Sequence, residues 1–141
     1  MLGSHAIKHW ATTQNIFAIS SGESEYYAVV KSASQAIGLQ SMQNDINVSL
    51  SGIEIKTDAS AAIGIASRRG LGRVRHIEVA QLWIQEKVAQ GKLKLIKVPG
   101  QVNLADACTK HVPNDILLYH CEHTMQHAQP GRHSLMPNII A

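Results

Sequence analysis

The chain has 141 residues, of which 45% are hydrophobic and 16% charged, so its composition predicts one folded domain and excludes a disordered chain. The formal net charge is +3, which is compatible with a polyanionic partner. No apolar run reaches the roughly 18 residues of a membrane span. The N-terminus lacks a signal-peptide pattern, and Cys108 and Cys121 form no CxxC pair. We therefore expect no membrane partner and a cytoplasmic or nuclear protein that is not secreted.

The first half of the chain predicts two strands, a long helix and a third strand. Residues 5–10 and 14–19 have the composition of two short strands joined as a hairpin. Ser20 and Glu23 have the spacing of a capping box, in which each side chain binds the backbone N–H of the other, and helical periodicity then continues to about residue 44. A strand is predicted over 53–57.

The second half predicts further alternation of helices and strands. A short helix is expected over 60–66, with Gly64 at a close-packing contact, and residues 67–76 form a basic loop with two glycines. Helical periodicity over 77–89 ends at Gly91. The remaining elements are a half-buried strand over 92–98 and helices over 104–110 and 114–127. The resulting order, β-β-α-β-α-α-β-α-α, predicts a mixed α/β layer protein.

Three acidic residues stand beside the ends of these elements: Glu25 in the first turn of the long helix, Asp58 after a strand, and Asp106 after the last strand. Hydrolysis of a phosphodiester can use two Mg²⁺ ions, which activate a water and stabilise the leaving oxygen. Mg²⁺ needs several oxygen ligands held by rigid elements. Each acid taken alone is most simply a structural or surface residue, but together they are candidate ligands of one cation site.

Four motifs around these acids occur in a fixed order: Glu25-Tyr26 after a Ser-x-Gly-Glu run, Thr57-Asp58-x-Ser-Ala-Ala-Ile, Arg-x-Arg-His76-Ile, and Val98-Pro99 followed by Ala105-Asp106-x-x-Thr-Lys110. Over residues 5–111 this pattern resembles the ribonuclease H domain at the end of copia-type retrotransposon Pol polyproteins. The resemblance implies a ribonuclease H-like mixed sheet with flanking helices over 1–111, with 112–141 as a C-terminal helix and loose tail. It also implies hydrolysis of the RNA strand of RNA–DNA hybrids, with Mg²⁺ or Mn²⁺ bound by the catalytic acids Glu25, Asp58 and Asp106. An upstream reverse transcriptase domain would belong to the full-length polyprotein.

One departure from the family concerns its first strand, which is central in the sheet and carries the first metal-binding Asp. Residues 1–22 contain no Asp or Glu, and the resemblance begins at about the second strand. The missing strand would remove several ladder hydrogen bonds of about 0.5–1.5 kcal/mol each from a domain stabilised by only about 5–15 kcal/mol. We therefore expect an N-terminally truncated, marginally folded remnant that is inactive as this isolated chain.

Two other classes of function stay open. The basic loop could be merely solvated, or it could make the chain a non-catalytic nucleic-acid-binding module, because arginine presents a planar fork of donors to phosphate. Its candidate residues are Arg68, Arg69, Arg73, Arg75 and His76. The predicted C-terminal helix carries several histidines on one face, which could be solvent-facing or could bind Zn²⁺. These residues are His120, His123 and His127, with Cys121 and His111 nearby.

Overall fold

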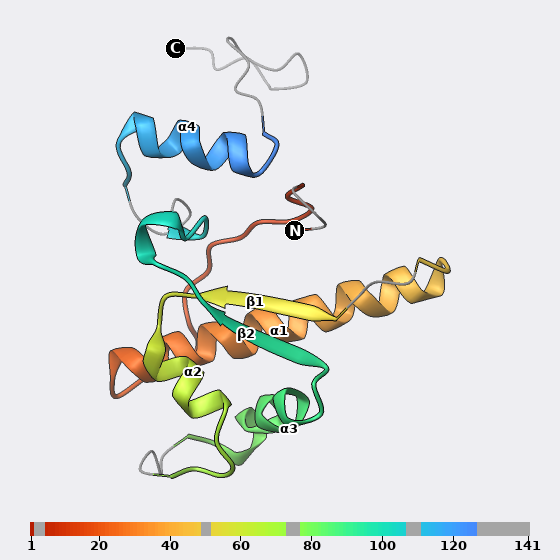
Figure 1. The fold of residues 1–141 in the computed structure, drawn as a ribbon. Coiled ribbons are helices and arrows are strands. Elements are labelled where there is room, and N and C mark those ends of the chain that lie inside the picture. Colours follow the sequence, from red (N-terminus) through yellow and green to blue (C-terminus); the bar gives the residue numbers. More distant parts are fainter. Residues whose placement is uncertain (2–4, 49–51, 73–76, 107–110, 127–141) are drawn as a thin grey trace, which may run out of the picture. The chain divides into compact units, whose positions relative to one another are not determined.

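The computed structural model describes residues 1, 5–48, 52–72, 77–106 and 111–126 (Figure 1). These described residues form a mixed α/β structure with four α-helices and a two-stranded parallel sheet. The chain divides into a larger unit, Thr12–Asn103, and a smaller unit, Met1–Ala11 with Leu104–Ala141. The domain boundary expected after residue 111 stays a prediction.

Helix α1, Ser21–Asp45, begins at the capping box expected from the sequence. The Ser20 hydroxyl accepts a hydrogen bond from the Glu23 N–H (3.3 Å), and the Glu23 carboxylate accepts one from the Ile19 N–H (2.7 Å). The glutamate therefore binds the residue before the N-cap, one position earlier than in the usual capping box. Because Glu23 is buried, a carboxylate inside the protein organises the start of this helix.

The sheet of the larger unit is a β-α-β arrangement. Strands β1 (Ile53–Thr57) and β2 (Leu93–Lys97) pair in parallel, with Thr57 opposite Lys97. Parallel strands need a crossover connection. The connection consists of α2 (Ser60–Ala66), the 3-10 turn η1 (Val79–Gln81) and α3 (Trp83–Ala89). A further 3-10 turn, η2, covers Gly100–Val102.

The predicted strand over 53–57 and the predicted helix over 60–66 are confirmed with the same bounds. The strand predicted over 92–98 is one residue shorter at each end. Where one helix was predicted over 77–89, the structure has the 3-10 turn η1 followed by α3, with Leu82 between them. Periodicity alone had not distinguished these two kinds of helix.

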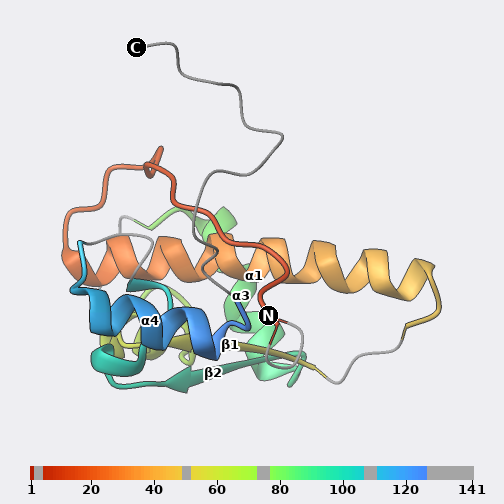
Figure 2. The same ribbon diagram turned by 90° about the horizontal axis from the view of Figure 1, so that it is seen from above.

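The core of the larger unit lies between α1, the sheet and the crossover helices. Helix α1 packs against β1 and α2, and α3 packs against β2 and α2. Figure 2 shows α1 running along one side of the two strands. The buried apolar side chains of α1 recur at helical spacing. They are Tyr26, Tyr27, Val29, Val30 and Ala33. The close packing expected at Gly64 is wrong, because a Cβ built there has no atom within 4 Å.

The two N-terminal strands expected over 5–10 and 14–19 are not formed, although all of these residues are described; His5 makes only an isolated bridge. The segment from Thr12 is instead held against α1 by side chains. The Gln14 amide donates to the Ser24 carbonyl (2.7 Å), and the Lys31 ammonium donates to the Thr12 hydroxyl. A hairpin of two strands is marginal without a third strand or a packed face, which explains why these local contacts prevail.

The smaller unit contains α4, Asn114–His123, which ends earlier than the helix predicted over 114–127. Its C-terminal end contacts the N-terminal segment, since the Ala6 N–H donates to the Thr124 carbonyl (3.3 Å). Of the helix expected over 104–110, only residues 104–106 are described, and they form a turn. No helix in the part of the chain that the structure describes is long and apolar enough to cross a membrane.

Candidate functional site

Asp58 follows β1 at the carboxyl end of the parallel sheet. Its side chain faces the loop after β2: the Asn103 amide donates to Asp58 Oδ1 (3.4 Å), and a Cβ on Gly100 would lie 3.3 Å from Oδ2. The Lys97 ammonium donates to the Asp58 carbonyl oxygen and, at 2.8 Å, to the Ser60 hydroxyl. Because Asp58 is only half-buried, its carboxylate remains accessible to a ligand from solvent.

Glu25 is exposed on the first turns of α1, and a close helix contact brings this end of α1 to the residues after Asp58 (Figure 1). Gly22 makes that contact possible, since a Cβ there would lie only 2.8 Å from the Cβ of Ala61. Gly22 precedes Glu25 by three residues, and Ala61 follows Asp58 by three. Two of the three predicted metal-binding acids therefore lie at the same end of the larger unit.

The third predicted acid, Asp106, belongs to the smaller unit, where it lies directly after the segment that joins it to the larger unit, and its convergence with Glu25 and Asp58 stays a prediction. Mg²⁺ is usually held by several oxygen ligands. The larger unit offers two carboxylates at its candidate site. Among the described residues, no group of three or more His, Cys, Asp or Glu side chains is arranged to hold a metal ion. Binding of Mg²⁺ or Mn²⁺ by Glu25, Asp58 and Asp106 stays a prediction.

The basic loop after α2 is organised partly by one of its own arginines. Arg68 folds back and donates from Nη2 to the Leu71 carbonyl oxygen (2.6 Å). Its guanidinium fills the space beside Gly72, where a Cβ would lie 2.8 Å from Arg68 Cζ, and Gly72 itself has a φ of 58°. Glycine is suited to this position on both counts. Arg68 therefore stabilises the loop with a guanidinium that is partly withdrawn from solvent.

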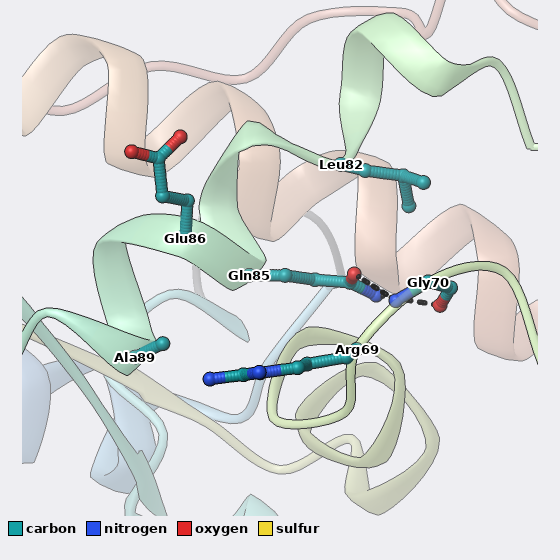
Figure 3. Close-up of a pocket in the computed structure, with 6 residues that line it drawn as sticks. All are labelled: Arg69, Gly70, Leu82, Gln85, Glu86 and Ala89. Atoms are coloured by element: carbon teal, nitrogen blue, oxygen red, sulfur yellow. Dashed lines mark hydrogen bonds between the residues drawn. The ribbon is translucent and has the colours of Figure 1, made fainter.

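The neighbouring Arg69 is exposed and lines a cavity of about 330 Å³ together with residues of α3 (Figure 3). The two arginines therefore differ: Arg68 is engaged within the loop, whereas Arg69 can meet a ligand. The other candidate nucleic-acid-binding residues, Arg73, Arg75 and His76, lie outside the described residues. Nucleic-acid binding by the whole loop stays a prediction.

Tyr26 is a residue of α1 whose side chain reaches the 3-10 turn η1. It is fully buried, and its hydroxyl donates to the Gln81 carbonyl oxygen (2.8 Å). Burial raises the pKa of Tyr26 to about 12, although the positive charge of Arg68 opposes the shift. Burial likewise raises the pKa of Tyr27, with a further contribution from the negative charge of Glu23. Both phenols are therefore neutral structural groups at physiological pH.

The candidate zinc-binding histidines of α4 have distinct surroundings. His120 is buried, whereas His123 is exposed, stacks on Tyr119 with ring centroids 3.9 Å apart, and places Nδ1 2.9 Å from the Tyr119 carbonyl oxygen. Cys121 is half-buried. His127 lies outside the described residues, and His111 is exposed. Stacking on Tyr119 and the contact with its carbonyl oxygen give His123 a structural role, and a zinc site stays a prediction.

Sequence reasoning missed three residues that shape the candidate sites: Lys97, Asn103 and Gln85. Lys97 is the last residue of its strand, and the carboxyl ends of parallel strands meet at one edge. That rule could have placed it beside Asp58. Gln85 is a buried amide on the inner face of α3. A single polar residue at an inward-facing helix position predicts a hydrogen-bonded side chain, and this signal could have identified it.

The fold and site define a mixed α/β unit with candidate carboxylates at the carboxyl end of two parallel strands. In comparisons with known proteins, the chain is similar to the retrovirus-related Pol polyprotein from transposon TNT 1-94 of Nicotiana tabacum, with 29% identity over 111 residues. The aligned segment is 78% of this chain but spans only 8% of that polyprotein. The similarity supports an origin in a retrotransposon Pol polyprotein. No family model and no solved structure matches the chain.

Proposed function

We propose that the chain is a ribonuclease H-like segment of a copia-type retrotransposon Pol polyprotein. Its ancestral activity is hydrolysis of the RNA strand of RNA–DNA hybrids, next to a reverse transcriptase domain. The observation that carries the proposal is the similarity to the tobacco Pol polyprotein over 111 residues. The ribonuclease H assignment is further supported by the placement of Asp58 at the end of β1, with the Glu25 end of α1 packed against the following helix.

The isolated chain is proposed to be inactive because its ligand set is incomplete. Two-metal hydrolysis needs carboxylates that hold both ions near the scissile phosphate. The larger unit offers Glu25 and Asp58, Asp106 is the proposed third ligand, and residues 1–22 contain no carboxylate at all. Mg²⁺ or Mn²⁺ is therefore a proposed cofactor of the complete site and not of this chain alone.

The test compares the chain with a version extended at its N-terminus by the segment that precedes the aligned region in the tobacco polyprotein. The purified chain should not cleave a labelled RNA–DNA hybrid in Mg²⁺ or Mn²⁺. The extended chain should cleave it and should lose activity on Asp58→Asn or Glu25→Gln. Glu54→Gln is the matched control, because Glu54 is an exposed β1 residue whose side chain pairs with Lys94 (3.3 Å).

Two results would contradict the proposal. Turnover by the unextended chain that disappears with Asp58→Asn would refute its inactivity. A folded extended chain without hydrolysis, or with hydrolysis indifferent to Asp58→Asn, would refute the ribonuclease H assignment.

A second candidate function is non-catalytic binding of a nucleic acid by the loop that follows α2. The observation that favours it is the exposed Arg69 on a loop held by Arg68 and Gln85. Binding of an RNA–DNA hybrid should persist in Asp58→Asn and Glu25→Gln and should weaken in Arg69→Ala. Because phosphate contacts release counterions, the affinity should fall steeply with salt. A hybrid affinity that is lost with Asp58→Asn but indifferent to Arg69→Ala would exclude this candidate.

A further inference from the structure

The side chain of Gln85 in α3 hydrogen-bonds three backbone atoms, which belong to Ile65 and Gly70. Its Oε1 accepts a hydrogen bond from the Gly70 N–H (2.8 Å). Its Nε2 donates to the Ile65 carbonyl oxygen (2.8 Å) and to the Gly70 carbonyl oxygen (3.0 Å). The amide thus uses its acceptor and its donor group on backbone atoms only, and it is buried while doing so.

These bonds fix the point at which the chain leaves α2. Ile65 lies in the last turn of α2, where a carbonyl has no later helical N–H to bind. Gly70 has a φ of 75°, a conformation that most other residues avoid. Gln85 therefore caps the end of α2 and fixes the left-handed backbone conformation of Gly70. Arg68 then fixes the next residue of the loop through its bond to the Leu71 carbonyl oxygen.

Arg69 lies in the sequence between Ile65 and Gly70, the two residues that Gln85 holds. Figure 3 shows its side chain extending past Gln85 and alongside Ala89, at the wall of the cavity of about 330 Å³. The Glu86 carboxylate points to the other side of α3 in the same view. Glu86 also lines the cavity, although its carboxylate is directed away from the Arg69 side chain in this view. The exposed Arg69 guanidinium is the positive charge at this cavity that an anion could contact.

We propose that Gln85 is a positioning residue, which keeps residues 67–72 folded so that Arg69 binds a phosphate of a nucleic-acid backbone. The inference rests on the second candidate function, binding of a nucleic acid by this loop. Its physical basis is entropic: a loop that is already ordered loses little conformational freedom on binding, whereas a free loop must be ordered by the ligand. Gln85 carries no charge, so its effect on affinity must act through Arg69.

The experiment measures the affinity for a fluorescent RNA–DNA hybrid across a salt series, using the full chain. Gln85→Leu should weaken binding about tenfold, because the ligand must now order the loop. Arg69→Ala should weaken binding and reduce the slope of log affinity against log salt by about 0.9, the value of one phosphate contact. Gln40→Leu is the control, since Gln40 is a half-exposed glutamine of α1 that does not line the cavity.

The decisive measurement is the double variant. If Gln85 acts by positioning Arg69, Gln85→Leu should change the affinity less than about twofold once Arg69 is already Ala. If Gln85 had only a general structural role, Gln85→Leu would weaken hybrid binding in the Arg69→Ala variant as much as it does in the unaltered chain. Amide exchange gives an independent readout, because the Gly70 N–H should exchange about tenfold faster in Gln85→Leu after loss of its acceptor.

The outcomes separate this inference from the function on which it rests. Weakening by Arg69→Ala with no effect of Gln85→Leu, or additive effects in the double variant, would overturn the role of Gln85 alone. No salt-dependent hybrid binding by the unaltered chain would overturn both. Should Gln85→Leu fail to fold, Gln85→Asn keeps the amide but is one methylene too short to reach all three partners, and the same criteria apply to it.

Discussion

Gly22 is the residue whose substitution best tests the candidate site, because it allows the close contact between α1 and α2. A Cβ at this position would lie 2.8 Å from the Cβ of Ala61, whereas two carbon atoms in good contact are separated by roughly 3.5–4.0 Å. Gly22→Ala must therefore push the two helices apart. The displacement acts on the contact that brings the Glu25 end of α1 to the residues after Asp58.

Two opposing effects set the magnitude. Ala is favoured over Gly within a helix by about 0.5–1 kcal/mol. Overpacking of a tight contact costs about 1–3 kcal/mol. We therefore expect Gly22→Ala to lower the free energy of unfolding by about 0.5–2 kcal/mol, measured by urea denaturation followed by circular dichroism.

The matched control is Gly38→Ala, also in α1, where a Cβ meets no atom within 4 Å. This substitution should raise the free energy of unfolding by about 0.5–1 kcal/mol, because only the helix propensity changes. Adding Ala61→Gly to Gly22→Ala should recover stability relative to the sum of the single effects. If Gly22→Ala stabilised the protein as much as Gly38→Ala does, the close helix contact and the placement of Glu25 that depends on it would be refuted.

Three further substitutions test the larger unit. Glu23→Ala removes the acceptor of the Ile19 N–H, and the free energy of unfolding in urea should fall by about 1–2 kcal/mol; no change would exclude a role for this cap. Burial raises the pKa of Tyr26 from the ordinary value of 10.0 to about 12, so the folded protein keeps a proton that the unfolded chain loses. Stability should therefore fall as the pH rises between these values, and thermal melts of Tyr26→Phe should show a weaker pH dependence. Ile84→Ala should lose about 2–5 kcal/mol in urea denaturation because Ile84 is fully buried, whereas Val79→Ala, at an exposed site, should change stability by less than about 0.5 kcal/mol.

Local signals predicted the elements whose stabilising contacts are themselves local. The start of α1 follows from Ser20 and Glu23, three residues apart, and β1 follows from a short apolar alternation that ends before Asp58. The prediction of strands over 5–10 and 14–19 was wrong because a strand depends on contacts that are not local. A strand needs partners from elsewhere in the chain, and the described structure offers residues 14–19 contacts with α1 instead.

The candidate site shows the same division between local and long-range information. The motifs identified Asp58 and Glu25, but the contact that brings their elements together depends on Gly22 and Ala61, which are far apart in sequence. The sequence had indicated Gly64 as the close-packing glycine, and that position is open. A glycine in a helix can be chosen for a contact or merely tolerated, and only the position of the neighbouring helix distinguishes the two cases.

Asp58 is surrounded by hydrogen-bond donors at this end of the larger unit. Lys97 is opposite Thr57 in the sheet, so its ammonium reaches the Asp58 carbonyl oxygen and the Ser60 hydroxyl at the carboxyl ends of both strands. The Asn103 amide supplies a donor to the carboxylate itself. Lys97 therefore holds the backbone at Asp58, and Asn103 is the residue that contacts its carboxylate. These contacts lead us to expect that the larger unit folds without a divalent ion, so that the midpoint of urea unfolding should be the same in chelator as in Mg²⁺. A midpoint that falls in chelator would contradict this expectation.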